Sequence, residues 1–554
     1  MLHSSVAVTG RDSIPGAFAE SVRLYGDRVA FWADGGLGKA WTYAEAGRQV
    51  DMLAAGLLAG SRLDPPEIGL ISENRPEWAI AYLAILKAGG TVVPIDANLK
   101  PNEIRFIVED AGLKVLFVSE QYEELLRKEG FAGRLFSFAS ESVSSWQSLM
   151  GAGDRPVAVD AATTAVLIYT SGTTGTPKAV ELTHRNILSN LEGIRAGLCF
   201  DWDDVFLSVL PLHHTFEATC GFLTPVMCGA SIVYARSLKS RDIMEDIGRT
   251  GVTVMCGVPL LYEKMAQSIR RGIKAAPVRR RALFHLLFGL SRIGWAVGLK
   301  LGRLFFRRLR KKAGLSTLRL FVSGGAAIPS RIAAFFNHLG ISFFQGYGMT
   351  ECSPVISFNR PDSIRFGSVG PPLPNVEVRI DDPDRSGVGE IVVRGENVTP
   401  GYRGNPEQTA ALVRDGWLHT GDLGMLRQGR LWITGRAKNV IVSAAGKNIY
   451  PEEIETLLVQ FDCVAEVVVF GRKKEGKQGE EVAALIVPDL ECRVYDRAGD
   501  GGRQDTEMLH KTIGDVIADV NRRMADYKRI VSFDIQTGEL EKTSTKKVKR
   551  FVYK

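Results

Sequence analysis

The sequence predicts a large N-terminal α/β domain with parallel-rich sheets and helices, a β-rich subdomain within it, and a small α+β domain at the C-terminal end. Apolar strand-like runs alternate with helical patterns over most of the chain, which is typical of parallel βαβ units. From Gly367 onward, short strands and turns replace this alternation. With 554 residues the chain is also too long for one hydrophobic core. We expect the large domain over 1–435, with its β-rich part at 367–435, and the small domain over 436–554.

The N-terminal part supplies the first βαβ units. Apolar runs predict strands at 67–72, 91–96 and 114–119. Apolar residues at helical spacing predict a helix over 77–87. A stretch with Gly and Pro at 151–156 then leads into another buried strand at 165–168. This order predicts a parallel sheet whose last strand in this part of the chain leads into a polar loop.

The loop at 169–180 is the centre of the predicted site. It is rich in hydroxyl groups, Gly172 and Gly175 let its backbone approach a ligand closely, and Lys178 adds a positive charge. We expect a helix to begin after it at Thr183 or His184. The Walker A pattern is absent from this loop, but its groups suit phosphate oxygens. The sequence therefore predicts a phosphate-binding loop.

Further strands are expected at 205–210, 231–235, 252–258, 319–322 and 341–344. Three of them run into Gly-rich or polar turns at 211–217, 323–328 and 345–351. Ligands of open parallel sheets bind at the carboxyl ends of strands, so these turns belong to the predicted site. The pair His213 and His214 in the first turn fits ligands, a base or a gate, and equally a structural pair.

The positive charge is local. The net charge is +7, yet residues 264–312 hold 15 Lys or Arg and no Asp or Glu, so the other 505 residues hold 54 basic and 62 acidic groups. Within this segment the apolar stretch 282–302 contains Arg292 and Lys300, which argues against a membrane span. Its basic flanks favour an interfacial helix pair on an anionic membrane. The alternative is a solvated basic face on an internal hairpin. Nucleic acid is disfavoured because the interleaved residues are aliphatic.

The cysteine pattern and the N-terminal residues indicate in which cellular compartment the protein is expected. Seven cysteines occur singly, without C-x-x-C or metal-like spacing, which favours reduced thiols. No charged start followed by an apolar core is visible at residues 1–12. We therefore expect a cytoplasmic protein that can contact the inner face of the membrane peripherally.

The C-terminal region reads as two parts. Strands are expected at 376–380, 390–394 and 430–434, with Thr420-Gly421-Asp422 in a turn. A polar, hinge-like stretch at 435–439 follows. The last part has a helix from about Pro451, strands at 464–470 and 481–487, a polar loop at 489–505, and a helix at 507–524. We interpret it as the small α+β domain.

Seven of these motifs, in this order, resemble the adenylate-forming superfamily. They are 169–180, 210–217, 323–328, 345–351, 420–422, 435–438 and 543–550. The basic insert and the stretch 445–453 are most similar to the long-chain fatty-acid–CoA ligase branch. The resemblance implies an enzyme that uses ATP and Mg²⁺ to convert a carboxylic acid into acyl-AMP and pyrophosphate. Coenzyme A then displaces AMP after the small domain has rotated.

The resemblance also implies roles for individual residues. The phosphates would be held by Thr170, Ser171, Gly172, Thr173, Thr174 and Lys178. The adenine would be lined by Gly324, Gly325, Ala326, Gly346, Tyr347 and Gly348. The remaining nucleotide contacts would be Thr350 at the α-phosphate, Glu351 at Mg²⁺, and Asp422 with Arg436 at the ribose. His214 would be the gate beside the acyl carboxylate, Lys438 the hinge, and Gly446 and Lys447 the loop facing coenzyme A.

The catalytic lysine is assigned by the family pattern Thr-x-Thr-x-Lys-Val-x-Arg. Among the tail lysines, only Lys547 fits it. The chain departs from the family at Ala179, Ala327 and Asn439, none of which removes a catalytic group. Three alternatives stay open: a carrier-protein acceptor, a different carboxylic acid, and a membrane-surface scaffold that binds nucleotide without turnover. The retention of Lys547 argues against the scaffold.

Overall fold

The computed structural model describes most of the chain. The described residues are 12–59, 66–139, 141–142, 144–151, 157–170, 177–361, 364–444, 446–461, 463–473, 479–490, 502–542, 548 and 550–553. They form two compact units. The first unit is Met1–Val378 with Val393–Leu418, and the second is Arg379–Val392 with His419–Lys554.

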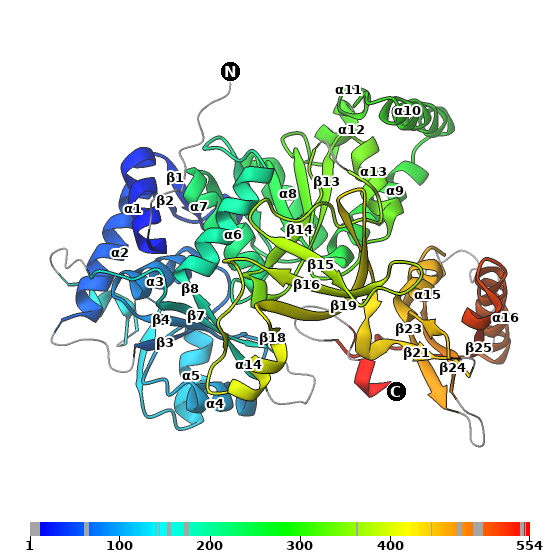
Figure 1. Ribbon diagram of the computed structural model, residues 1–554. Helices are drawn as coiled ribbons and strands as arrows, with labels where there is room; N and C mark the ends of the chain where they lie inside the picture. The colour runs from blue at the N-terminus through cyan, green and yellow to red at the C-terminus, as the bar shows by residue number, and fades with distance from the viewer. Residues whose placement is uncertain are drawn as a thin grey trace. The chain divides into compact units, whose positions relative to one another are not determined.

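Two large sheets form the framework of the first unit (Figure 1). The eight-stranded sheet has the order β14 (Val355–Phe358), β13 (Ser342–Gly348), β12 (Leu320–Ser323), β11 (Val254–Gly257), β9 (Val205–Ser208), β10 (Ser231–Tyr234), β1 (Val29–Trp32) and β2 (Ala40–Thr42). Its inner strands are parallel, and only the edge strands β2 and β14 pair antiparallel with their neighbours. The parallel-rich α/β class predicted from the sequence is confirmed.

The seven-stranded sheet carries the predicted phosphate loop. Its order is β17 (Gly401–Tyr402), β8 (Lys178–Thr183), β7 (Thr164–Thr170), β4 (Thr91–Pro94), β3 (Glu67–Ile71), β5 (Val115–Val118) and β6 (Arg134–Ser137). Strands β3 to β7 are parallel, whereas β8 runs antiparallel to β7 and β17 antiparallel to β8. Strand β8 was not predicted, because its residues directly follow the polar loop and lack a turn signal that would separate the two.

Helices cover the two sheets. In the first unit they are α1 (Ile14–Tyr25), α2 (Tyr43–Leu57), α3 (Pro76–Lys87), α4 (Pro101–Asp110), α5 (Glu120–Lys128), α6 (His184–Gly197), α7 (Thr224–Cys228), α8 (Ser240–Thr250), α9 (Pro259–Lys274), α10 (Val278–Ala296), α11 (Gly302–Phe305), α12 (Arg307–Lys312), α13 (Ser330–His338) and α14 (Pro406–Leu412). Helix α6 begins where predicted, because Thr183 and Asn186 form a reciprocal cap at its start. Among the described residues, no helix is both long and apolar enough to cross a bilayer.

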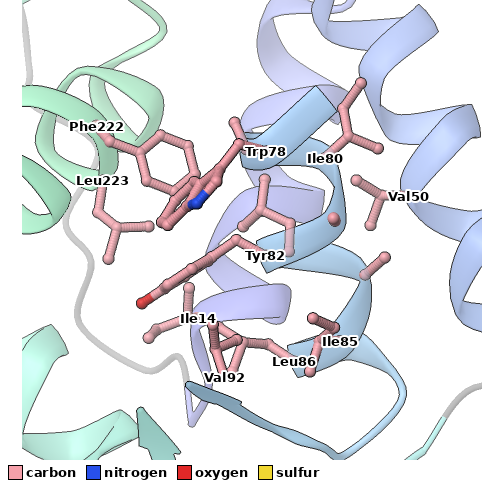
Figure 2. Packing of buried hydrophobic residues seen from close by; sticks show 14 of the residues in the cluster. Ile14, Val50, Trp78, Ile80, Tyr82, Ile85, Leu86, Val92, Phe222 and Leu223 are labelled. Carbon is pink, nitrogen blue, oxygen red and sulfur yellow. The ribbon is translucent and has the colours of Figure 1, made fainter. Parts of the chain in front are cut away.

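The largest core surrounds α3, which is buried on every side. Trp78 and Tyr82 stack with ring centroids 5.2 Å apart, and Phe222 packs edge-on against both rings (Figure 2). Phe222 belongs to a π-helix at Glu217–Leu223, which the sequence analysis did not predict. Such wide turns often occur at functional sites. The core therefore ties the helix between β3 and β4 to the turn that carries the histidine pair.

The second unit contains part of the β-rich region and the C-terminal domain. The β-rich sheet has the order β15 (Glu377–Asp381), β16 (Gly389–Arg394), β19 (Trp417–Arg427) and β18 (Val413–Arg414), with β20 (Arg430–Arg436) paired to β19; of these strands, β18 belongs to the first unit. The C-terminal elements are β21 (Ile441–Val442), β22 (Asn448–Ile449), α15 (Pro451–Leu458), β23 (Val464–Lys473), β24 (Glu480–Pro488), α16 (Gly502–Arg522) and β25 (Ile530–Ile535). This confirms the predicted small α+β domain. The predicted boundary between the large and the small domain, at 435–436, marks where one would rotate against the other, and it stays a prediction.

Candidate active site

The predicted phosphate loop joins β7 to β8. Thr170 ends β7, Lys178 begins β8, and the two are register partners in the hairpin. Ser171, Gly172, Thr173 and Thr174 lie outside the described residues. The hairpin therefore fixes both ends of the loop at the end of a buried strand, as expected for a ligand site.

Lys178, Tyr402 and Glu351 form a cluster beside this loop. The Lys178 Nζ lies 5.0 Å from the centroid of the Tyr402 ring. The Tyr402 hydroxyl donates to Glu351 Oε1 at 2.8 Å, and burial together with the nearby Glu351 charge raises the pKa of Tyr402. The main-chain oxygen of Glu351 accepts from Thr399 at 2.9 Å. A cation and a carboxylate thus meet around one phenol ring.

The turn that bears Thr350 and Glu351 is held on both sides. Thr350 lies 3.1 Å from Thr215, Oγ1 to Oγ1, which joins the turn after β13 to the turn after β9. The Asn190 and Asn397 amides donate to the Cys352 carbonyl at 3.2 and 3.0 Å. Both asparagines are buried. The two hydroxyls and the carboxylate are therefore set in a rigid frame of side-chain hydrogen bonds.

The histidine pair lies at the end of β9, on a turn fixed by Asn74. The Asn74 amide donates to the Leu210 carbonyl at 2.6 Å and to Ser208 Oγ at 2.9 Å, and its oxygen accepts from the Leu212 amide at 3.0 Å. Ser208 in turn donates to Glu217 Oε1 at 2.6 Å. This chain of bonds sets the direction in which the next two residues leave the strand.

His213 and His214 lie against each other, with ring centroids 4.1 Å apart. The Nε2 of His213 lies 3.4 Å from Asp96 Oδ2, and both side chains are buried. The ligand atoms of these three residues lie within 4.8 Å of one another, a donor set that suits a transition metal. Mg²⁺ prefers oxygen ligands, so Glu351 remains its predicted ligand.

Glu217 is a fully buried acid that the resemblance did not assign. Its side chain has no exposure, and burial raises its pKa to about 8. Oε1 accepts from Ser208, whereas Oε2 has no hydrogen-bond partner among the described residues. Glu217 begins the π-helix, and its bond from Ser208 ties that helix to the end of β9.

The predicted adenine-lining residues occupy two neighbouring strand ends. Gly324, Gly325 and Ala326 follow β12 and the last two are exposed. Gly346, Tyr347 and Gly348 lie within β13, which continues to Gly348 and pairs with β14, whereas the sequence predicted a turn there. A Cβ at Gly348 would lie 1.8 Å from the Pro354 carbonyl oxygen, so only glycine fits. The β13–β12 register places these two segments side by side.

In the second unit, Asp422 and Arg436 are partners on β19 and β20. Arg436 Nε lies 2.7 Å from Asp422 Oδ1, and their Cα atoms are paired in the ladder. The predicted turn at Thr420-Gly421-Asp422 is wrong: these residues lie inside β19, with Gly421 at φ +69°. The hydroxyl of Thr420 donates to the Ile391 carbonyl at 2.7 Å, which anchors the strand at this irregular point.

The C-terminal residues flanking Lys547 are anchored, while 543–547 lie outside the described residues. On one side Lys542 is held by Glu466, and on the other Arg550 binds the Val469 carbonyl at 2.9 Å and the Glu455 carboxylate. Lys438 lies in a 3₁₀ turn at Ala437–Asn439.

The loop predicted to face coenzyme A follows β21. Gly446 has φ +70°, its amide donates to the Ser443 carbonyl at 2.8 Å, and the Lys447 Nζ lies 4.6 Å from the Tyr527 ring centroid.

Several residues that shape the site escaped the sequence analysis. They are Asn74, Asp96, Asn190, Asn397 and Tyr402. Each occurs singly in an ordinary stretch of sequence, so spacing carries no signal for it. Only an explicit test of every polar residue near a predicted strand end would have suggested Asn74 and Asp96.

Comparisons with known proteins agree with this arrangement. Residues 18–403 match the AMP-binding enzyme family, and residues 453–547 match the AMP-binding enzyme C-terminal domain. A feruloyl-CoA synthase of Amycolatopsis sp is 30% identical, covering 92% of this chain and 93% of that protein. The peroxisomal long chain acyl-CoA synthetase 6 of Arabidopsis thaliana is 32% identical over 81% of this chain and 69% of its own. A long-chain-fatty-acid–CoA ligase of Mycobacterium bovis, FadD15, is 28% identical over 92% and 90%.

Solved structures agree as well. MatB from Rhodopseudomonas palustris, solved with bound ATP, has a TM-score of 0.78 at 25% identity and covers 98% of both chains. The anthranilate CoA ligase AuaEII, in complex with anthranoyl-AMP, has the same TM-score of 0.78 at 22% identity, with 98% of this chain and 96% of that chain covered. At that identity the second likeness shows the fold alone. The resemblance drawn from the seven motifs is confirmed, and the chain belongs to the AMP-binding enzyme family.

Proposed function

We propose that the protein is an AMP-forming acid–CoA ligase that activates a long-chain fatty acid. The observation that carries the proposal is the cluster of Lys178, Tyr402, Glu351, Thr350 and Thr215, which gathers a cation, a carboxylate and hydroxyls where two sheets end. The names of relatives with high coverage support coenzyme A as acceptor. Long-chain relatives, together with the basic insert, support a fatty acid.

In the first half-reaction, the acid's carboxylate oxygen attacks the α-phosphorus of ATP and pyrophosphate leaves. Negative charge grows on the phosphate oxygens, so fixed cations and hydroxyl donors stabilise the transition state. We assign Lys178 and the loop 170–174 to the β- and γ-phosphates, Thr350 to the α-phosphate, and Lys547 to the cation that stabilises the transferring group. Asp422 and Arg436 would bind the ribose, and 324–326 with 346–348 would line the adenine.

Glu351 fits a role as magnesium ligand. One of its oxygens accepts from Tyr402, which fixes the carboxylate and leaves the second oxygen to coordinate the ion. Oxygen donors of this kind, with the phosphates of ATP, are what Mg²⁺ selects. When bound, Mg²⁺ would neutralise charge on the polyphosphate. The residues themselves orient that charge: Lys178 approaches from the hairpin, and the Asn190 and Asn397 amides keep the turn rigid.

In the second half-reaction, the thiol of coenzyme A attacks the acyl carbon of acyl-AMP and AMP leaves. We propose that the small domain turns about Lys438, which lies in a short 3₁₀ turn directly after β20. This rotation would move Lys547 away from the acyl-AMP and bring the loop containing Gly446 and Lys447 to it. His214 would be the gate at the acyl carboxylate, held by the Asp96–His213 pair.

An aromatic acid is the second candidate substrate. The feruloyl-CoA synthase relatives at 30% identity and 92% coverage specifically favour it. A panel of fatty acids of increasing length, with ferulate and anthranilate, separates the two in a pyrophosphate-release assay. We expect turnover to rise with chain length and thioester to form with free coenzyme A. Turnover of ferulate alone would overturn the long-chain assignment, and thioester only on carrier protein would overturn the acceptor.

A further inference from the structure

We propose that the outward face of α10 and the cations around it form a docking surface for an anionic lipid bilayer. The α10 outer face consists of Leu283, Leu286, Leu290 and Ile293 of the helix, together with its C-cap residue Val297. These residues are 55, 61, 43, 64 and 69% exposed. Their spacing of three and four residues places them on one side of the helix. An exposed apolar stripe of this length is uncommon on a monomeric protein and indicates an interaction site.

The opposite side of α10 is anchored in the first unit, beside α9 and α13 (Figure 1). Ser291 Oγ donates to the His338 carbonyl at 2.8 Å, and Phe288 packs on Phe335 with ring centroids 5.8 Å apart. Gly302, the first residue of α11, lies so close to the α13 end that a Cβ would be 2.1 Å from the His338 oxygen. The helix is therefore apolar on both sides. Only one side faces the core.

Positive charge is concentrated in the same segment of the chain. Ten exposed Lys or Arg lie in 278–312: Arg279, Arg280, Arg281, Arg292, Lys300, Arg303, Arg307, Arg308, Lys311 and Lys312. The segment 264–312 has no Asp or Glu to pair with them. Each Lys or Arg near an anionic leaflet adds about 1 kcal/mol of attraction. Leu, Ile and Val side chains inserted between these cations match an interfacial helix.

A lipid surface fits this combination better than the other occupants. A second copy of the chain would bring two strongly positive faces together, which like-charge repulsion opposes. A nucleic acid would contact the cations but leave the aliphatic stripe without a partner, since stacking needs aromatic rings. A bilayer offers both an anionic headgroup layer and an apolar interior.

One residue of the basic flank is not part of the surface. Arg310 is 4% exposed and donates to the carbonyls of Leu315, Ser316 and Leu318. It holds the turn between α12 and β12. Any charge variant must therefore leave Arg310 in place.

The test uses two variants of the full chain and two matched controls. The charge variant is R307E/R308E/K311E/K312E, and its control is R23E/R105E/K128E/R241E, which makes the same charge change at exposed positions elsewhere. The apolar variant is L286E/L290E/I293E, and its control L37E/L238E/L490E changes equally exposed leucines. Each protein is sedimented with vesicles of phosphatidylcholine, or of equimolar phosphatidylcholine and phosphatidylglycerol.

We expect wild-type protein and both controls to sediment with the anionic vesicles, less so as salt rises. At low salt the charge variant should lose about three orders of magnitude in binding, because four cations of about 1 kcal/mol each are removed. The apolar variant should lose the binding that persists at high salt. Melting temperature and pyrophosphate release from a short acid check folding and the active site separately. Absence of wild-type binding, equal loss in variants and controls, or a preference for duplex DNA that the apolar variant retains would each overturn the proposal.

Discussion

At the scale of single residues, buried polar groups decide how the site is built. Glu217 has no exposure, and its pKa is raised from 4.5 to about 8 because burial disfavours the carboxylate. Neither its sequence context nor its spacing predicts this, since it follows the histidine pair in a polar stretch. Asn74 and Asp96 are similar cases: they act through long-range contacts, which no local pattern contains.

The raised pKa of Glu217 predicts a pH-dependent stability. Between pH 4.5 and about 8 the unfolded chain loses this proton while the folded chain keeps it, so the free energy of unfolding falls as pH rises through that range. Glu217→Gln removes the titration. The melting temperature of this variant minus that of wild type should therefore increase as the pH rises from 4.5 to about 8. In free energy of unfolding, the change in this difference should be a few kcal/mol. Thermal melts of both proteins across that range measure the difference, and a constant difference would contradict the burial argument.

Glu351→Gln tests the magnesium role. The amide oxygen can still accept from Tyr402, so the shape of the turn is kept while the charge is removed. We expect acyl-AMP formation to fall by about two orders of magnitude and extra Mg²⁺ to restore it only partly. Tyr402→Phe is the matched control, because it deletes the hydrogen bond and keeps the carboxylate, and it should lose much less. A small loss in Glu351→Gln together with a large loss in Tyr402→Phe would mean that Glu351 acts through Tyr402 and not through a metal.

At the scale of elements, the positions of strands and helices could be predicted from the sequence better than the pairing of the strands. Strands β3, β4, β5, β9 and β10 and helix α3 lie within a few residues of their predicted places. Strand β8 was missed, and β19 was taken for a turn at Asp422. Both lie beside glycines and hydroxyl residues, which favour turns locally but here support a hairpin and an irregular ladder. The pairing partners lie far away in sequence and override that preference.

In the helical segment α10–α12, the buried Arg310 is expected to contribute to the stability of the fold. Arg310 donates to three carbonyls, two of them buried, so Arg310→Ala leaves the Leu315 and Leu318 carbonyls without this partner and should cost about 3 kcal/mol of unfolding free energy. Arg308→Ala, two residues away and exposed, should stay within about 0.5 kcal/mol of wild type. Chemical denaturation of both variants compares them. A similar stability of the two would show that the turn does not depend on the guanidinium.

At the scale of the whole molecule, the sequence predicted the class of fold and the family, because seven motifs in one order are far more specific than any one of them. The identity of the acid could not be predicted. It depends on how side chains from separate elements close around the acyl chain, and that packing has no linear pattern. The hinge role proposed for Lys438 concerns a rotation of the C-terminal domain, and a rotation leaves no local pattern in the sequence.

The two half-reactions should separate at Lys547. Lys547→Ala removes the cation proposed for the α-phosphate, so acyl-AMP formation should fall by about two orders of magnitude or more. Conversion of supplied acyl-AMP to thioester should change much less, because the small domain would by then have turned this lysine away. Lys542→Ala is the control, since that lysine is tied to Glu466 and should affect both steps alike. Equal loss of both steps in Lys547→Ala would refute the assignment.

The most direct test of the central claim follows an oxygen atom. Palmitate with heavy oxygen in its carboxylate is supplied with ATP, Mg²⁺ and coenzyme A, and the products are analysed by mass spectrometry. If the carboxylate attacks the α-phosphorus, one heavy oxygen per turnover must remain on AMP when the thiol displaces it. We predict labelled AMP in an amount equal to the palmitoyl thioester formed. Label in pyrophosphate or inorganic phosphate, or thioester formation with unlabelled AMP, would contradict an adenylate intermediate.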